Sequence, residues 1–311
     1  MATTYNMTTT AQIDAGVPLF FNRTALSTLF PQYVYEKWAQ KYILPSNSST
    51  TWKARRYNRL PAAKTKLGEG ITPQCEKLSK VDILATIDQY GSLVMITDVV
   101  EITTDGMAMA KRAEMQADQI RNTRDQLCRD TMNATASVIT CSHGVGTATL
   151  LNRTDIDTVA TTLYGNLADH ITGYVKAAPG QGTAPLRPAY VAIFHYLLRE
   201  DLMKVSGAIG TQQYPQQNFI DENEWCSVGE TRWIQSTQAP VSDDGVYSNL
   251  IFGKEAYATI KLSSGSLQSW VDPPGSGDDK LRQRGSASWK MWSGWRIIQD
   301  LFLINLRSTK S

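Results

Sequence analysis

The feature that most constrains the fold is a pair of strand-like segments with too little apolar surface to form a core. Residues 52–59, Trp-Lys-Ala-Arg-Arg-Tyr-Asn-Arg, alternate as a strand does, yet basic side chains fall on both faces. Residues 81–88 return as a second strand with apolar side chains on one face. A two-stranded ribbon of this kind is marginal alone in water. We therefore expect it to lie on a neighbouring surface.

This ribbon is the candidate interaction site of the chain. The run from Lys53 to Lys66 holds six basic residues and no acidic one, which suits contact with an acidic surface of a neighbouring subunit. A merely solvated basic face is the alternative. The candidate contact residues are Trp52, Lys53, Arg55, Arg56, Tyr57, Arg59, Lys64, Lys66 and Glu69.

The remaining pattern mixes helices and strands, which indicates an α+β protein. Apolar spacing predicts a helix over 25–42, a long helix over 105–134 with a narrow stripe of small residues, and a third from Thr154 to Ile171. Residues 207–245 are expected to be loop-rich, and residues 272–286 turn-rich. Short strands are predicted over 189–194, 247–252 and 256–262, with two more between 287 and 307 that meet near Ser293-Gly294.

Composition excludes several classes of protein. The chain has 31 basic and 29 acidic residues, so it lacks the charge of a dedicated nucleic-acid binder, and any DNA contact must be local and non-specific. It has no recognisable secretory signal and no run of about 18 apolar residues, so no membrane contact is predicted. Its four cysteines contain no C-x-x-C pair, so neither a zinc knuckle nor a disulfide framework is indicated.

No catalytic, cofactor or metal site is predicted. Cys141, Ser142 and His143 are adjacent in a loop, where neighbouring side chains point apart, whereas a nucleophile needs its base within hydrogen-bond reach. His170 and His195 are isolated histidines without clustered carboxylates, which favours structural roles. A soluble hydrolase that uses the 141–143 loop is the alternative from a different class.

Several short motifs, taken in order, resemble a known family. The N-terminal ones are Leu26-Ser-Thr-Leu-Phe-Pro, Trp52-Lys-Ala-Arg-Arg-Tyr-Asn, Leu67-Gly-Glu-Gly-Ile-Thr-Pro and Gln89-Tyr-Gly-Ser-Leu-Val-Met-Ile-Thr-Asp. The later ones are Tyr190-Val-Ala-Ile-Phe-His, Phe252-Gly-Lys-Glu-Ala-Tyr and Arg282-Gln-Arg-Gly-Ser-Ala-Ser-Trp-Lys. They cover most of the chain and resemble the major capsid proteins of tailed bacteriophages with the Hong Kong 97 fold, in particular a podovirus-type branch. Tyr196 stands where that family usually has a proline.

The resemblance implies an architecture and a function. It implies an N-terminal arm at 1–45, an extended β-ribbon loop at 46–89, a peripheral domain with a long spine helix at 90–150 and 286–311, and an axial domain at 151–285. Such a chain would self-assemble in the bacterial cytoplasm into hexamers and pentamers of an icosahedral shell, which encloses double-stranded DNA in the virion. An encapsulin-like compartment shell is the alternative within the same fold.

The implied partners are further copies of the chain, a portal and a possible decoration protein, with non-specific contact to the packaged DNA. Some members of the family carry an internal scaffolding region at the N-terminus that is cut away. Residues 1–24 are Thr-rich and show no heptads. We therefore expect this segment to be retained, and a separate scaffolding protein to act during assembly.

Overall fold

In the computed structural model, strand β6 (Tyr190–His195) lies near the middle of a seven-stranded sheet, and all six of its side chains are buried. The structure describes residues 33–45, 49–64, 66, 69–70, 72, 75–97, 99, 107–141, 147–171, 188–214, 220–263, 267–272, 281 and 283–311, all within a unit that spans 31–311. The strand order is β5 (Val138–Thr140), β14 (Leu303–Ser308), β10 (Tyr247–Phe252), β6, β9 (Thr231–Ser236), β8 (Glu224–Val228) and β7 (Ala208–Gly210).

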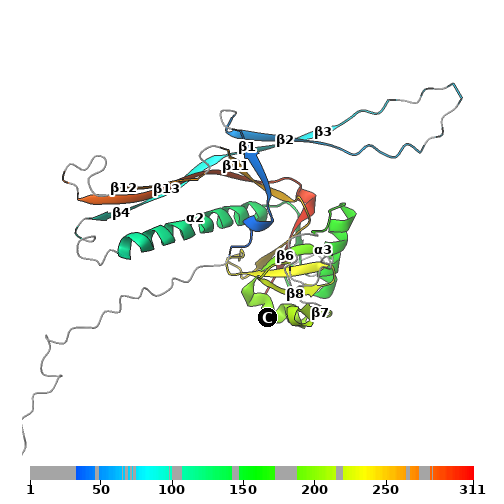
Figure 1. Cartoon of the computed structure of the whole chain (residues 1–311). Coiled ribbons are helices and arrows are strands. Elements are labelled where there is room, and N and C mark those ends of the chain that lie inside the picture. The colour runs from blue at the N-terminus through cyan, green and yellow to red at the C-terminus, as the bar shows by residue number, and fades with distance from the viewer. Residues whose placement is uncertain are drawn as a thin grey trace, which may run out of the picture. The chain divides into compact units, whose positions relative to one another are not determined.

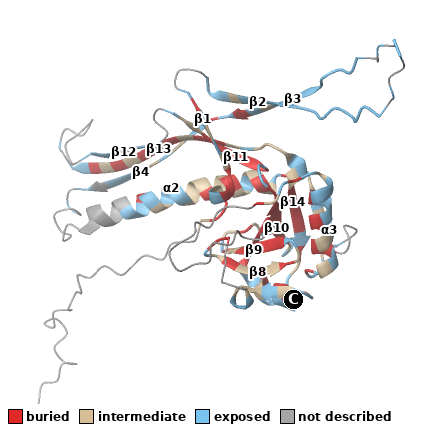
Figure 2. Ribbon diagram, turned by 45° about the vertical axis from the view of Figure 1, so that its right-hand side comes forward, coloured by how far each residue is buried: buried red, intermediate tan, exposed pale blue. Residues whose placement is uncertain are grey.

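Helices cover both faces of β6. Alternate side chains of a strand point to opposite sides, so β6 contributes to two separate cores. Tyr190 and Phe194 belong to a core that includes Leu163 of α3 (Arg153–Gly165). Val191 belongs to a second core that includes Met132 of the long helix α2 (Met107–Asn133). Figure 2 shows the buried strands of this sheet in red between the helices. The short helices near this sheet are η2 (Tyr196–Leu198), α4 (Arg199–Lys204), η3 (Thr211–Gln213) and η5 (Asp300–Phe302).

A second sheet lies along helix α2 (Figure 1). Its path is β1 (Gln40–Leu44), β11 (Tyr257–Leu262), β13 (Arg284–Ile297) and β12 (Leu267–Asp272), and β4 (Asp88–Thr97) also pairs with β13. Two polar contacts join the sheet to the helix. Gln116 Nε2 donates a hydrogen bond of 2.8 Å to the Ala287 carbonyl, and Trp289 Nε1 donates one of 3.1 Å to Gln119 Oε1. A third sheet is the two-stranded ribbon of β2 (Thr51–Tyr57) and β3 (Lys80–Thr86).

Several sequence predictions are confirmed. The long helix occupies 107–133, and the strands predicted over 189–194, 247–252 and 256–262 appear as β6, β10 and β11 within one residue of the predicted limits. The third predicted helix begins at Arg153 but ends at Gly165, before the expected end at Ile171. Residues 1–32 of the arm expected at 1–45 lie outside the described residues, as do Ser142, His143 and residues 273–280.

The helix predicted over 25–42 is wrong for its described part. Residues 36–38 form only a 3-10 turn, η1 (Glu36–Trp38), and Tyr42 lies in strand β1. β1 pairs in parallel with β11, and this pairing outweighs the helical spacing of the apolar residues. The loop-rich prediction for 207–245 is wrong as well, because β9 is a central strand beside β6 and β8 pairs with β9.

The predicted break at Ser293-Gly294 is also wrong, since β13 runs through both residues to Ile297. Gly294 does not form a turn; it allows the backbones of β13 and β3 to approach each other closely. A Cβ atom there would lie 2.4 Å from the carbonyl oxygen of Thr86, the last residue of β3. The small-residue stripe predicted for α2 is likewise not its buried face. The buried residues of α2 for which side chains are described are Gln116, Asp125, Cys128 and Met132.

Asp125 fixes the start of the described chain to α2. Its carboxylate accepts backbone N–H groups from Val34 at 3.3 Å, Tyr35 at 2.8 Å and Glu36 at 3.1 Å. Burial raises the pKa of Asp125 to about 6, although these three hydrogen bonds oppose the shift. A raised folded-state pKa favours the protonated form. The contribution of this group to stability is therefore greatest below its ordinary pKa of 3.8 and falls as the pH rises through about 6.

Replacing Asp125 with asparagine should change how the free energy of unfolding depends on pH. The amide keeps an oxygen for the backbone N–H groups but cannot ionise, so the native chain should lose stability relative to Asp125→Asn between about pH 4 and about pH 6. Denaturant unfolding across this range measures the difference, with Asp243→Asn in an exposed turn as the control for the loss of one charge. A constant difference between Asp125→Asn and the native chain at every pH would contradict the assignment.

Candidate intersubunit surface

The ribbon places its charged side chains in a defined register. β2 and β3 are antiparallel, with Lys53 opposite Leu84 and Arg55 opposite Asp82. The carboxylate of Asp82 lies 2.8 Å from both Lys53 Nζ and Arg55 Nε. These two cations hold the pKa of Asp82 well below its usual range. Asp82 thus neutralises part of the basic run within the ribbon itself.

The base of the ribbon packs on its own chain. Trp52 is half-buried and stacks on Tyr42 of β1 with ring centroids 4.9 Å apart. It joins a small core with Ala85 and Ile87 on one side and Ile260 of β11 on the other. Beside this core, Thr86 lies against Gly294 of β13. The ribbon is therefore anchored at the end where its two strands approach the second sheet.

Beyond its base the ribbon has large exposed side chains. Tyr57 is 60% exposed, Leu84 54% and Val81 41%, and Figure 2 shows the described ribbon beyond its base almost entirely in the colour of exposed residues. Exposed apolar groups of this size on a marginal two-stranded element make it a candidate surface for contact with another molecule. That the contact is with a neighbouring subunit stays a prediction from the sequence.

The predicted contact residues divide into two groups. Trp52 lies in the ribbon's anchoring core. The other eight are exposed, namely Lys53, Arg55, Arg56, Tyr57, Arg59, Lys64, Lys66 and Glu69. Lys53 and Arg55 share Asp82, whereas Arg56 and Arg59 have no ion-pair partner among the described residues.

A second exposed surface was missed by the sequence analysis. Leu93 and Met95 of β4 are 53% and 59% exposed, and Trp270 of β12 is 43% exposed. Leu93 and Trp270 both lie opposite Ser288 of β13, so they flank the same small residue on one side of the sheet. The apolar run 93–96 gives no such signal in the sequence, because a fully buried strand has the same composition.

The residues considered for catalysis have structural surroundings. Cys141 is buried, and burial raises the pKa of its thiol to about 12, which opposes the thiolate form that a nucleophile requires. His195 accepts a hydrogen bond from the Leu197 N–H, and burial lowers its pKa. His170 stacks on Tyr190 with ring centroids 4.3 Å apart. Within the described ranges, no group of three His, Cys, Asp or Glu side chains could hold a metal ion, and no helix is long and apolar enough to cross a membrane.

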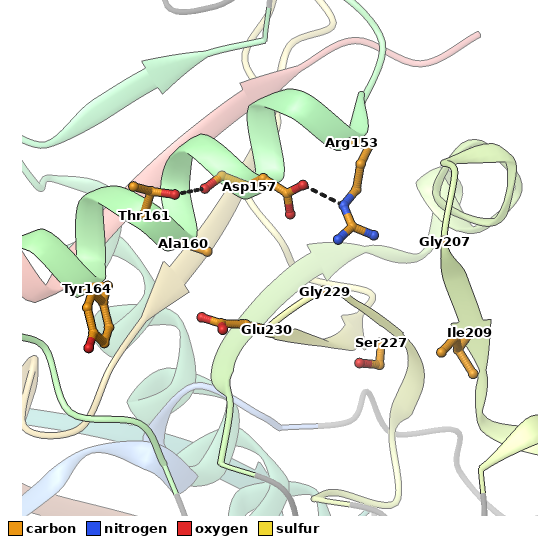
Figure 3. Close-up of a pocket in the computed structure, with 10 residues that line it drawn as sticks. All are labelled: Arg153, Asp157, Ala160, Thr161, Tyr164, Gly207, Ile209, Ser227, Gly229 and Glu230. Carbon is orange, nitrogen blue, oxygen red and sulfur yellow. Dashed lines mark hydrogen bonds and ion pairs between the residues drawn. The ribbon is translucent and has the colours of Figure 1, made fainter.

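A pocket of about 670 Å³ lies beside α3 (Figure 3). Arg153 lines one side of this pocket. Its Nε binds Asp157 at 2.7 Å, and its Nη1 donates a hydrogen bond to the Ser206 carbonyl at 3.3 Å. Gly207 and Gly229 both have positive φ, and Cβ atoms there would lie 2.6 Å and 3.0 Å from the guanidinium. Arg153 thus ties two turns to α3. The pocket lining contains neither cysteine nor histidine, so it offers no nucleophile with a histidine base.

Comparison with known proteins decides the family. The family model of the phage capsid protein matches residues 80–297. The chain belongs to the phage capsid protein family. No curated protein sequence is a significant match for it.

Solved capsid structures show that the fold extends beyond the matched residues. The capsid of cyanophage P-SCSP1u aligns with a TM-score of 0.66 at 15% identity over 99% of this chain and 97% of that chain. The capsid of Helicobacter pylori bacteriophage KHP30 aligns with a TM-score of 0.67 at 9% identity over 99% of both chains. The capsid of Ralstonia phage GP4 aligns with a TM-score of 0.67 at 11% identity over 98% of both chains. This phage capsid protein therefore has the Hong Kong 97 fold over nearly its whole length.

Family and fold together establish a structural protein of the virion. It is a major capsid protein that assembles with copies of itself into an icosahedral shell, and it is not an enzyme. The hydrolase alternative is therefore set aside. The match to phage capsid proteins also favours the virion shell over an encapsulin-like compartment.

Gly294→Ala should destabilise this capsid protein, because the new Cβ would lie 2.4 Å from the Thr86 carbonyl and would push the ribbon base from β13. The expected loss is about 1–3 kcal/mol of unfolding free energy, as for other overpacked sites, measured by denaturant unfolding. Gly165→Ala is the matched control, since no atom lies within 4 Å of a Cβ at the end of α3. Equal unfolding free energies of the two variants would show that the Gly294 and Thr86 backbones are not in close contact.

Proposed function

We propose that this capsid protein forms hexamers and pentamers of a shell around double-stranded DNA, and that the β2–β3 ribbon lies across an adjacent copy in each ring. The ribbon combines an anchored base with exposed Tyr57, Val81 and Leu84, and this combination supports the proposal. An adjacent copy would cover these groups, which the single chain leaves exposed. A head-to-tail contact of this kind closes into a ring when its rotation permits.

Arg56 and Arg59 are the cations that the ribbon offers to a neighbour. Lys53 and Arg55 are both paired with Asp82, whose single carboxylate offsets one of their two positive charges and links the ribbon's own strands. Lys64 and Lys66 are exposed nearer the tip and add to the same positive surface, while Glu69 adds the opposite charge. Charge complementarity sets register and partner choice more than affinity. The ribbon's apolar groups therefore supply binding energy, and its cations supply orientation.

The division of the chain that we propose is an arm at 1–45, the ribbon loop at 46–89, a peripheral domain at 90–150 and 286–311, and an axial domain at 151–285. The long helix α2, which lies along β13, supports its role as the spine of the peripheral domain. The podovirus-type branch stays a prediction from the sequence motifs.

The further partners that we propose are a separate scaffolding protein during assembly in the host cytoplasm, a portal, a possible decoration protein, and packaged DNA in non-specific contact. The near-balanced net charge of +2 supports weak, local DNA contact.

The double variant Arg56→Glu/Arg59→Glu should fold normally and fail to form shells. Both side chains are exposed and lack an ion-pair partner among the described residues, so their reversal should leave the subunit intact. Opposing like charges across an interface cost several kcal/mol. Negative-stain microscopy of the variant, co-expressed with its assembly partners, should show at least a tenfold loss of closed particles.

The matched control is Lys254→Glu/Lys310→Glu, which makes the same change in net charge at exposed positions off the ribbon. Circular dichroism and thermal unfolding check that each variant folds. A normal particle yield from the ribbon variant, or an equal loss in the control, would count against the ribbon as the contact surface.

A further inference from the structure

A pocket of about 320 Å³ with excess positive charge lies where η1, β1, β11 and α2 meet. Its lining is separate from the ribbon residues and from the pocket in Figure 3. Two carboxylates, Glu36 and Asp125, line it. Five cations line it as well, namely Lys37, Lys41, Arg121, Arg124 and Lys261.

Both carboxylates are already engaged. Glu36 binds Arg124 and lies 3.4 Å from Lys261 Nζ. Asp125 accepts the three backbone N–H groups described above. Lys41 and Arg121 are left without an ion-pair partner in the part of the chain that the structure describes. Lys37 is paired with Asp221, whose Oδ2 lies 2.6 Å from Nζ, so Lys41 and Arg121 are the cations of this pocket that lack a carboxylate partner among the described residues.

Burial affects two of these cations. Arg124 Nε is buried and has no hydrogen-bond partner within the described ranges, although the same guanidinium is paired with Glu36. Burial lowers the pKa of Lys261; Glu36 opposes that shift, and the guanidinium of Arg124 adds to it. An anion in the pocket would favour the charged form of Lys261.

We infer that this pocket binds a carboxylate presented by an acidic segment of a partner protein. The planar guanidinium forks of Arg121 and Arg124 suit a carboxylate, which can accept two parallel hydrogen bonds. The pocket provides these two arginines from α2 and two lysines from β1 and β11, around a space large enough for a side chain.

The lining argues against duplex DNA as the occupant. A duplex carries one charge per about 1.7 Å of its axis and is held by an extended row of cations. Here Asp118 and Asp130 alternate with the arginines along α2, and Glu36 and Asp125 lie in the pocket itself. These four carboxylates would repel a continuous polyanion, whereas a single carboxylate can enter beside Lys41 and Arg121.

The test measures binding of fluorescein-labelled hexaglutamate to the full chain by fluorescence anisotropy at low salt. Lys41→Gln/Arg121→Gln should weaken binding at least tenfold, whereas Lys41→Arg, which keeps the charge at position 41 and leaves Arg121 intact, should bind within about threefold of the native chain. Lys254→Gln/Lys310→Gln removes the same charge from exposed positions elsewhere and should change binding less than twofold. Thermal unfolding checks that each variant is folded.

The same variants are tested with a labelled 20-base-pair duplex and with inorganic phosphate as competitors. Equal weakening of hexaglutamate binding in the pocket variant and the Lys254/Lys310 control would overturn the inference, because binding would then follow net charge alone. Loss of duplex binding in the pocket variant, with hexaglutamate binding unchanged, would overturn it in favour of a DNA contact. The binding test does not measure shell formation, so the result of the binding test is independent of the proposed ribbon contact.

Discussion

Strand β13 pairs with three other strands, β4, β11 and β12, and its buried side contacts helix α2. Its residues Ala287, Trp289 and Met291 are all nearly inaccessible to solvent. At Gly294 the same strand also meets the base of the ribbon. A single continuous strand thus connects the spine helix, the second sheet and the ribbon, and a change in its position would move all three.

This arrangement explains how a subunit can be well folded and still incomplete. The seven-stranded sheet has helices on both faces, and the two packed cores between sheet and helices stabilise it within the single chain. The ribbon has only the small core around Trp52 and Ile260. Its exposed apolar residues gain free energy when another molecule covers them. Under the proposed ribbon contact, assembly would bury these exposed residues against an adjacent copy.

The sequence predicted the elements whose signal is local. The ribbon and the long helix each have a periodic pattern, and β6 is a short apolar run, so each can be recognised without knowledge of the rest of the chain. The strand with which a segment pairs cannot be recognised from that segment's own sequence. Residues 40–44 become a strand because β11 lies beside them, and β9 is central because it pairs with β6. Gly294 looked like a turn because the nearby Thr86 backbone is invisible in sequence.

The candidate site was predictable to the same extent. Alternation placed the ribbon's basic residues on an exposed element, but it could not show that Asp82 pairs with Lys53 and Arg55. That contact depends on the register between two strands separated by a long connection. The basic pocket was invisible for a similar reason, because its cations come from α2, β1 and β11 and the chain segment around η1.

A cryo-electron microscopy reconstruction of the assembled shell would measure how far the ribbon side chains are exposed within the particle. We expect that Tyr57, Val81 and Leu84, exposed in the single chain, are covered by an adjacent copy and that Arg56 lies near a carboxylate of that copy. A shell in which these side chains face solvent in every copy would contradict the proposed ribbon contact.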